Sequence, residues 1–116
     1  MANESGAAGP AIIVATGWHE PIYIISSEGR TRVRNWRNTD NGMPDDSSFT
    51  WGYYGGGVHN TAYAILREFF GREVAESHTG DLVECWLSRL DQERGFRASR
   101  DKVAKLLGAY VAQRMG

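Results

Sequence analysis

The sequence predicts an α+β protein, in which a small N-terminal antiparallel sheet of three to four strands is packed by three C-terminal helices. Two observations predict this class. Short β-branched or alternating segments occupy the first part of the chain, and apolar residues at helical spacing fill the second half. The length of 116 residues suits a single domain. We expect residues 1–10, which are small and polar, to form a loose tail and residues 11–116 to form the domain.

The strands are expected in the first half of the chain. Residues 11–16 and 22–26 are rich in β-branched side chains, and arginine alternates with other residues over 30–36. Residues 37–48 contain many Asn, Asp, Gly and Pro residues, which predicts a loop. Residues 49–53 are a candidate for a short edge strand that precedes the first long helix.

Three helices are expected in the second half of the chain. Apolar residues recur at helical spacing over 58–70, which predicts the first helix. The second is expected to run from a Thr79 cap to about Glu93. Residues 96–98 then form a bridge to Ser99, a favourable N-cap residue for the third helix.

Composition excludes several classes of function. The formal net charge of −1 gives no global attraction to nucleic acid or to an anionic membrane. The single cysteine, Cys85, excludes an intrachain disulfide and favours a reducing compartment, so we expect a cytoplasmic protein. We find no transmembrane run and no signal peptide.

An aromatic and glycine-rich segment lies where the first long helix begins. It contains three large aromatic residues followed by three consecutive glycines, and a histidine comes soon after. Backbone N–H groups at a helix N-terminus attract anions, so the segment is a candidate binding site; the alternative is a tight turn that packs the helix on the sheet. The candidate residues are Trp51, Tyr53, Tyr54, Gly55, Gly56, Gly57 and His59.

A second candidate site is a ladder of arginines in the third expected strand. Alternate strand residues share a face and lie about 7 Å apart, which is close to the spacing of phosphates along a nucleic-acid strand. Three interpretations are open: a solvated face that protects a sheet edge, a surface for an acidic protein partner, or a nucleic-acid site with a stacking tryptophan. The candidate residues are Arg30, Arg32, Arg34, Trp36 and Arg37.

No residue pattern indicates catalysis or a metal site. His19, His59 and His78 lack the spacing of metal ligands. Cys85 falls on the apolar stripe of an expected helix, as a buried and unreactive thiol would. We therefore predict no catalytic residue, no metal and no cofactor.

The segment 49–57 with the helix that follows resembles a small family of uncharacterised proteins from bacteria, phages and mobile elements. The shared features are an F-x-W-G-Y-x-G-x-G segment and an A-x-A-I-L helix, here Phe49–Gly57 and Ala62–Leu66. A proline that commonly follows the glycines in the family is Val58 here, and the match is poor before Tyr23. The resemblance implies no activity and no site residue, but it does imply a phage or mobile-element setting.

These observations lead to one main functional hypothesis and two alternatives. The main hypothesis is a non-enzymatic protein-interaction module, an inhibitor or accessory factor that acts on host defence machinery in the bacterial cytoplasm. One alternative is a binder of a phosphorylated small molecule or nucleotide at Gly55–Thr61. The other is nucleic-acid binding through Arg30–Arg37. A homodimer is compatible with all three, and no membrane partner is expected.

Overall fold

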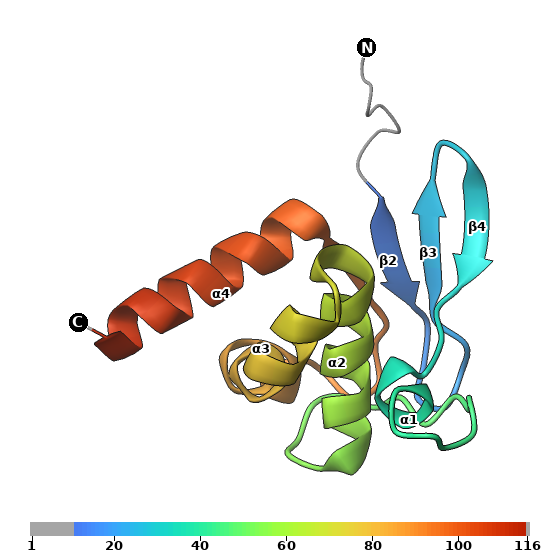
Figure 1. Cartoon of the computed structure of the whole chain (residues 1–116), viewed down its shortest axis with the longest axis horizontal. Coiled ribbons are helices and arrows are strands. Elements are labelled where there is room, and N and C mark those ends of the chain that lie inside the picture. The colour runs from blue at the N-terminus through green and yellow to red at the C-terminus, as the bar shows by residue number, and fades with distance from the viewer. Residues whose placement is uncertain (1–10, 116) are drawn as a thin grey trace.

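The α+β class is confirmed by the structure, a computed structural model that describes residues 11–115 (Figure 1). The expected tail at residues 1–10 lies outside these residues. None of the helices within them has the length and hydrophobicity needed to cross a membrane. The elements in chain order are β2 (Ile12–Ala15), β3 (Tyr23–Ser26), β4 (Gly29–Arg32), α1 (Trp36–Thr39), α2 (Gly56–Phe70), α3 (Arg72–Cys85), the 3₁₀ turn η1 (Leu87–Arg89), β5 (Phe96–Ser99) and α4 (Arg100–Met115).

The sheet has four antiparallel strands in the order β4-β3-β2-β5. The expected bridge at residues 96–98 is wrong, because this segment forms β5 and pairs with β2 near the other end of the chain. Ala98 lies opposite Ile13, and both side chains are fully buried. The Phe96 ring packs edge-on against Trp51 and Trp86. These contacts hold the segment extended on the sheet.

The third strand is shorter than expected. It ends at Arg32 instead of Trp36. The buried Val33 still donates its N–H to the carbonyl of Ile22 at 2.8 Å, and the chain then turns, where Trp36 N–H donates to Arg34 O at 2.8 Å. Asn35 then caps the short helix α1, and its side chain accepts from the N–H of Asn38 at 3.2 Å. Of the predicted row of arginines, β4 therefore contains Arg30 and Arg32.

The expected edge strand at residues 49–53 is not formed. Phe49 and Trp51 are both fully buried, so this segment crosses the core instead of lying at a sheet edge. Its backbone bonds to the helical side of the molecule: Thr50 N–H donates to Thr61 Oγ1 at 3.1 Å, and Gly52 N–H donates to Leu87 O at 2.8 Å. Phe49 O also accepts from the N–H of His19 at 3.0 Å, in the connection between β2 and β3.

Three helix boundaries also differ from expectation, one of them the end of α3, which lies at Cys85 instead of about Glu93 because Trp86 leaves helical geometry and the 3₁₀ turn η1 follows. Helix α2 begins two residues early, at Gly56, and α3 begins at Arg72 because Gly71, with φ of 96°, makes the tight connection between them. Thr79 is therefore inside α3, where its hydroxyl donates to Ala75 O at 2.6 Å. The predicted N-cap of the last helix is confirmed, because Ser99 Oγ accepts from the N–H of Lys102 at 3.0 Å.

Helix α2 is the centre of the core. It lies between the sheet and α3, and the short α1 packs beside it (Figure 1). Its buried face includes Val58, Ile65 and Leu66, all fully shielded from solvent. Since the helices cover one side of the sheet, the opposite side is left for other contacts.

Candidate interaction surface

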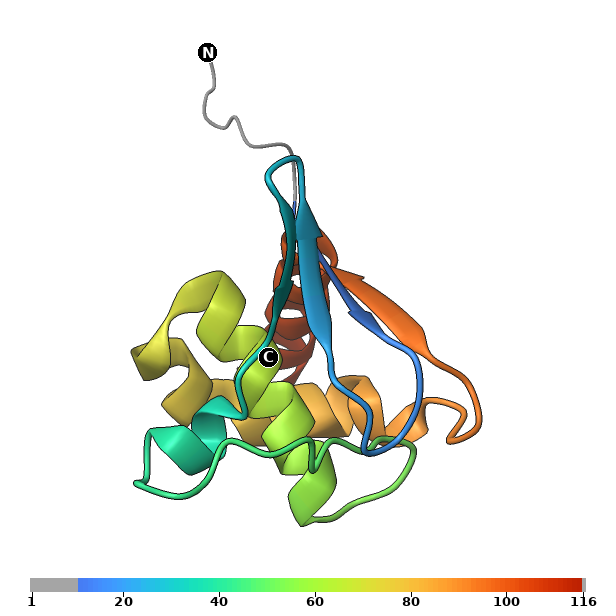
Figure 2. The ribbon, with the colours of Figure 1, turned by 90° about the vertical axis from the view of Figure 1, so that its right-hand side faces the viewer.

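The face of the sheet that is turned away from the helices carries an ordered set of side chains, here named the open sheet face. Residues that lie opposite each other in paired strands point to the same side of a sheet. Ile13 and Ala98 point into the core, so the rows on either side of them point outward. Figure 2 shows the helices behind the sheet and to its left, and no helix in front of it. The outward rows are Ser99, Ile12, Ile25 and Arg30, and Arg97, Val14, Tyr23 and Arg32.

The centre of the open sheet face is apolar. Ile25 is 41% exposed, and Ile12, Val14 and Tyr23 are each partly exposed. These four side chains come from the two central strands, so they lie next to one another. A contiguous apolar surface of this kind is typical of a contact site, whereas a single exposed apolar side chain is not.

Arginines from both edge strands frame the apolar centre. The Arg30 guanidinium lies 4.2 Å from the centre of the Tyr23 ring, and Arg97 extends the frame on β5. Neither arginine forms an ion pair with any residue in the range 11–115. The open sheet face therefore presents positive charge at two edges of an apolar patch.

Arg32 differs from these two because it has an internal partner. Its guanidinium bonds both carboxylate oxygens of Asp45 in the loop that follows α1. The hydrogen bond from Arg32 holds the pKa of Asp45 below its usual value, and the backbone N–H of Asn35 adds to the effect. Asp45 is thus ionised at neutral pH and neutralises Arg32, which anchors the loop to the sheet.

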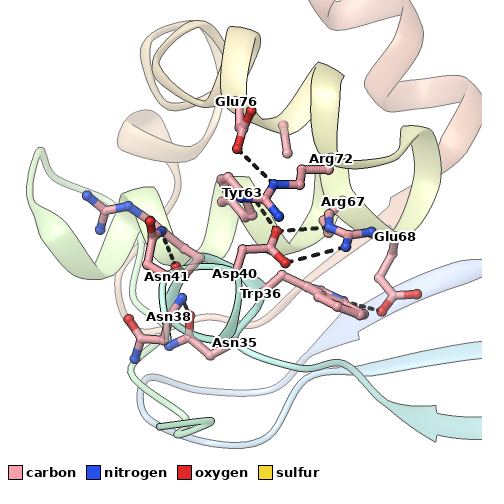
Figure 3. Close-up of polar contacts among 12 residues, drawn as sticks. Asn35, Trp36, Asn38, Asp40, Asn41, Tyr63, Arg67, Glu68, Arg72 and Glu76 are labelled. Atoms are coloured by element: carbon pink, nitrogen blue, oxygen red, sulfur yellow. Dashed lines mark hydrogen bonds and ion pairs between the residues drawn. The ribbon is translucent and has the colours of Figure 1, made fainter. Parts of the chain in front are cut away.

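Trp36 begins α1 and lies in a contact between α1 and α2 (Figure 3). Arg34, beyond the end of β4, is exposed, and its Nε lies 3.9 Å from Asp45 Oδ2. The guanidinium groups of Arg34 and Arg67 lie 5.2 Å and 4.2 Å from the Trp36 ring centre. The indole N–H donates to Glu68 Oε2 at 2.7 Å. Trp36 is therefore committed to an internal polar contact and does not belong to the open sheet face.

Asp40 is the acceptor at the centre of the same contact (Figure 3). It accepts from Tyr63 Oη at 2.6 Å and from Arg67 Nε at 3.0 Å. The Arg67 hydrogen bond lowers the pKa of Asp40, and that of Tyr63 adds to the lowering against the effect of burial. Burial, together with the bond to Asp40, raises the pKa of Tyr63 to about 12. This network fastens α1 to α2.

Arg37 and His59 meet at the first turn of α2. Arg37 Nη1 donates to Asn60 Oδ1 at 2.9 Å and also approaches the carbonyl of Gly56 at 3.4 Å. His59 Nδ1 lies 2.9 Å from the carbonyl of Gly55, so this nitrogen carries the proton of that bond. Both side chains are occupied in holding the start of the helix.

The aromatic residues of the glycine-rich segment divide between core and surface. Trp51 is fully buried, and its indole N–H donates to Arg94 O at 2.8 Å, so this ring packs in the core. The Tyr53 hydroxyl lies 2.9 Å from Thr50 Oγ1, and its ring is 36% exposed. Tyr54 is 63% exposed. Only the two tyrosines could contact a partner.

The three glycines of this segment have different surroundings. A β-carbon on Gly57 would overlap the Thr50 side chain, and one on Gly55 would lie 2.6 Å from the Tyr53 ring. A β-carbon on Gly56 would meet nothing within 4 Å. Gly57 is therefore needed for close packing of α2 against the segment that crosses the core.

The structure thus separates residues that the sequence suggested as one surface. Arg30 and Arg32 belong to the open sheet face, whereas Trp36 and Arg37 contact α2. Arg34 lies beside Asp45 and the Trp36 ring. Tyr54 forms no hydrogen bond or ring contact with Arg34 or Arg37 in the described chain.

The apolar centre of the open sheet face was not predicted from the sequence, and neither was Arg97, the arginine that flanks it on β5. The outward residues Ile12, Val14, Tyr23 and Ile25 occupy alternate positions of two predicted strands, so period-two alternation could have identified them. Arg97 could not have been placed with them, because its strand was not predicted.

Helix α3 carries the thiol Cys85 and the neighbouring pair His78 and Asp81. Within residues 11–115, no group of three His, Cys, Asp or Glu side chains could hold a metal ion. Burial raises the pKa of the Cys85 thiol, which lowers the share of reactive thiolate. His78 Nδ1 lies 2.9 Å from Asp81 Oδ2, three residues later on the same helix.

Fold and surface together define a small α+β domain with helices on one face of its sheet and an exposed apolar surface framed by arginines on the other. The chain belongs to a family of unknown function, DUF6166, whose model matches residues 21–109. No curated protein and no solved structure matches the chain.

Proposed function

We propose that this protein is a non-enzymatic binding module that contacts another protein through the open sheet face. The observation that carries the proposal is the exposed apolar centre with Ile25 and Tyr23, framed by Arg30 and Arg97. Tyrosine and arginine are frequent among the residues that dominate binding energy, and such residues surround an apolar core in many protein interfaces.

A protein partner is favoured over nucleic acid by the composition of the patch. Single-stranded nucleic acid is held mainly by aromatic rings that stack on bases. Here the only ring on the open sheet face is Tyr23, already covered by Arg30, and its neighbours Ile12, Val14 and Ile25 cannot stack on a base. The complementary surface is an apolar protrusion with acidic residues around it.

The biological form that we propose is an inhibitor or accessory factor of a phage or mobile element, acting on host machinery in the bacterial cytoplasm. Support comes from the resemblance at Phe49–Gly57 and from the single cysteine of the chain. A small domain that binds through one rigid sheet face has the simple architecture that such a factor needs.

The test is quantitative capture of partner proteins from a bacterial lysate, with paired variants. Ile25→Ser and Arg30→Glu change the open sheet face. Met43→Ser and Arg94→Glu make the same chemical changes at exposed positions elsewhere, where Met43 is 56% exposed and the Arg94 side chain 83%. We expect each open-face variant to lose a specific partner about tenfold or more, and each control to retain it.

Two outcomes would contradict this function. One is equal capture of the partner by Ile25→Ser and wild type. The other is captured material that disappears on nuclease treatment and on raising the salt concentration, which would identify nucleic acid as the ligand.

A further inference from the structure

The edge strand β5 has an unused side. Among residues 11–115 it pairs with β2 only, so every second residue of Phe96–Ser99 directs its backbone N–H and C=O groups away from β2. In Figure 2, β5 forms the right-hand edge of the molecule and no element lies beyond it. Exposed edge strands can accept a further strand unless proline, a bulge or inward-pointing charge prevents it, and β5 has no proline.

A cleft of about 620 Å³ lies beside this edge. Its apolar wall is formed by Trp86, Leu90 and Phe96. The Trp86 and Phe96 rings pack edge to face with centres 5.3 Å apart, and Trp86 is only 8% exposed, so the wall is firmly held. A cleft of this size accommodates one or two large side chains.

The charges at the cleft are positive. Arg97 and Lys102 line it, and no acidic residue does. The Lys102 ammonium lies 4.9 Å from the centre of the Trp86 ring and, within residues 11–115, has no ion-pair partner. An occupant that supplies carboxylates would pair both cations.

We propose that β5 and this cleft bind an extended segment of another protein, in which apolar and acidic residues alternate and which adds to the sheet as a fifth strand. Main-chain hydrogen bonds would hold the segment, and its side chains would provide specificity. The residue opposite Ala98 or Phe96 would point to the helix side, toward Trp86 and Lys102. The residue opposite Arg97 would point outward and supply a carboxylate to it.

A second copy of this chain fits the edge less well. Antiparallel pairing of two β5 strands centred on Arg97 would place the Arg97 side chains of both copies opposite each other. Like charges opposite each other in neighbouring strands are destabilising. Charge complementarity therefore favours an acidic segment of a different protein.

This inference does not depend on the proposed function. The open sheet face and the cleft share only Val14 and Arg97, whereas Ile25 belongs to the first and Lys102 to the second. Variants of Ile25 and Lys102 therefore test the two sites separately.

The test uses a random seven-residue peptide library displayed on phage and selected on the full-length protein. An enriched peptide is then synthesised with a fluorescent label, and its Kd is measured by anisotropy with wild type and variants. Lys102→Glu reverses charge in the cleft. It places Glu three residues after the Ser99 cap, where Glu completes a capping box, so this variant is expected to fold. Arg94→Glu and Met43→Ser, at exposed positions outside both sites, serve as controls.

We expect enriched peptides to alternate apolar and acidic residues. Lys102→Glu should weaken their binding at least tenfold, and both controls should bind within about twofold of wild type. N-methylation of alternate peptide nitrogens should abolish binding, because it removes the main-chain donors of strand pairing.

Several results would overturn the inference. They are the absence of any enriched sequence, enrichment of peptides without acidic residues, and equal binding by Lys102→Glu or by the N-methylated peptide. A concentration-dependent dimer that Lys102→Glu stabilises would also overturn it, because a second copy would then occupy the edge. Loss of lysate partners on Ile25→Ser has no bearing on this result and tests only the open sheet face.

Discussion

The Arg67 guanidinium lies 4.2 Å from the centre of the Trp36 ring and at the same time binds Asp40 with its Nε at 3.0 Å. One side chain of α2 thus holds both ends of the short helix α1 (Figure 3). A helix of four residues is too short to be stable by itself. The position of α1, and of the loop after it, therefore depends on this polar contact.

Removing the Asp40 charge should destabilise the protein. In Asp40→Asn the Arg67 guanidinium loses its carboxylate, and the free energy of unfolding is expected to fall by roughly 1–3 kcal/mol. Urea unfolding followed by circular dichroism measures the change. Asp101→Asn removes a carboxylate whose side chain is 79% exposed and should change stability by less than about 0.5 kcal/mol. Equal effects of the two substitutions would show that the contact contributes little.

The ion pairs of Asp40 and Asp45 predict how the free energy of unfolding changes at acidic pH. Arg67 lowers the pKa of Asp40, and Arg32 lowers that of Asp45, so both groups hold protons less tightly in the folded than in the unfolded protein. Their contribution is complete above the unfolded value, near pH 4, and is lost as the pH falls through the lower folded values. Urea unfolding between neutral pH and pH 2 should show a decline that is smaller in Asp40→Asn. An identical decline in this variant would contradict the assignment.

The raised pKa of Tyr63 predicts a separate loss of unfolding free energy at alkaline pH. Its pKa of about 12 lies above the ordinary value of 10, so the folded protein holds the phenol proton more tightly. The contribution is complete below pH 10 and is lost as the pH rises toward 12, by up to about 3 kcal/mol. Tyr63→Phe should abolish this part of the alkaline decline. The check is urea unfolding of both proteins between pH 8 and 11; parallel curves would be the contrary result.

The sequence predicted the fold class because its signals are local. The β-branched runs over residues 11–16 and 22–26 and the helical spacing over 58–70 each lie within one element that packs on the core. The strand β5 was missed because its partner β2 lies more than eighty residues earlier in the chain, and four residues carry little pattern of their own. Tertiary pairing decided its conformation.

The candidate site was predicted in part for a similar reason. Arg30 and Arg32 share a face because strand geometry is local. The burial of Trp51 depends on Phe96 and on the Arg94 carbonyl, both more than forty residues away. No local pattern distinguishes such a tryptophan from one at a binding surface.

The adjacent glycines at the start of α2 provide a matched test of the glycine-rich segment. A β-carbon on Gly57 would overlap the Thr50 side chain, so Gly57→Ala should cost roughly 1–3 kcal/mol of unfolding free energy. Gly56 is the first helical residue and has open space at the same position, so Gly56→Ala should be neutral or stabilising by up to about 1 kcal/mol. Chemical denaturation of both variants measures the difference.

Partner capture by the same two variants separates packing from binding at this segment. If the glycines serve packing alone, Gly56→Ala retains the partner, and any loss in Gly57→Ala follows its fraction unfolded. A stable Gly56→Ala protein that no longer captures its partner would instead show that backbone groups at the start of α2 contact the ligand, and the binding surface would then extend beyond the open sheet face.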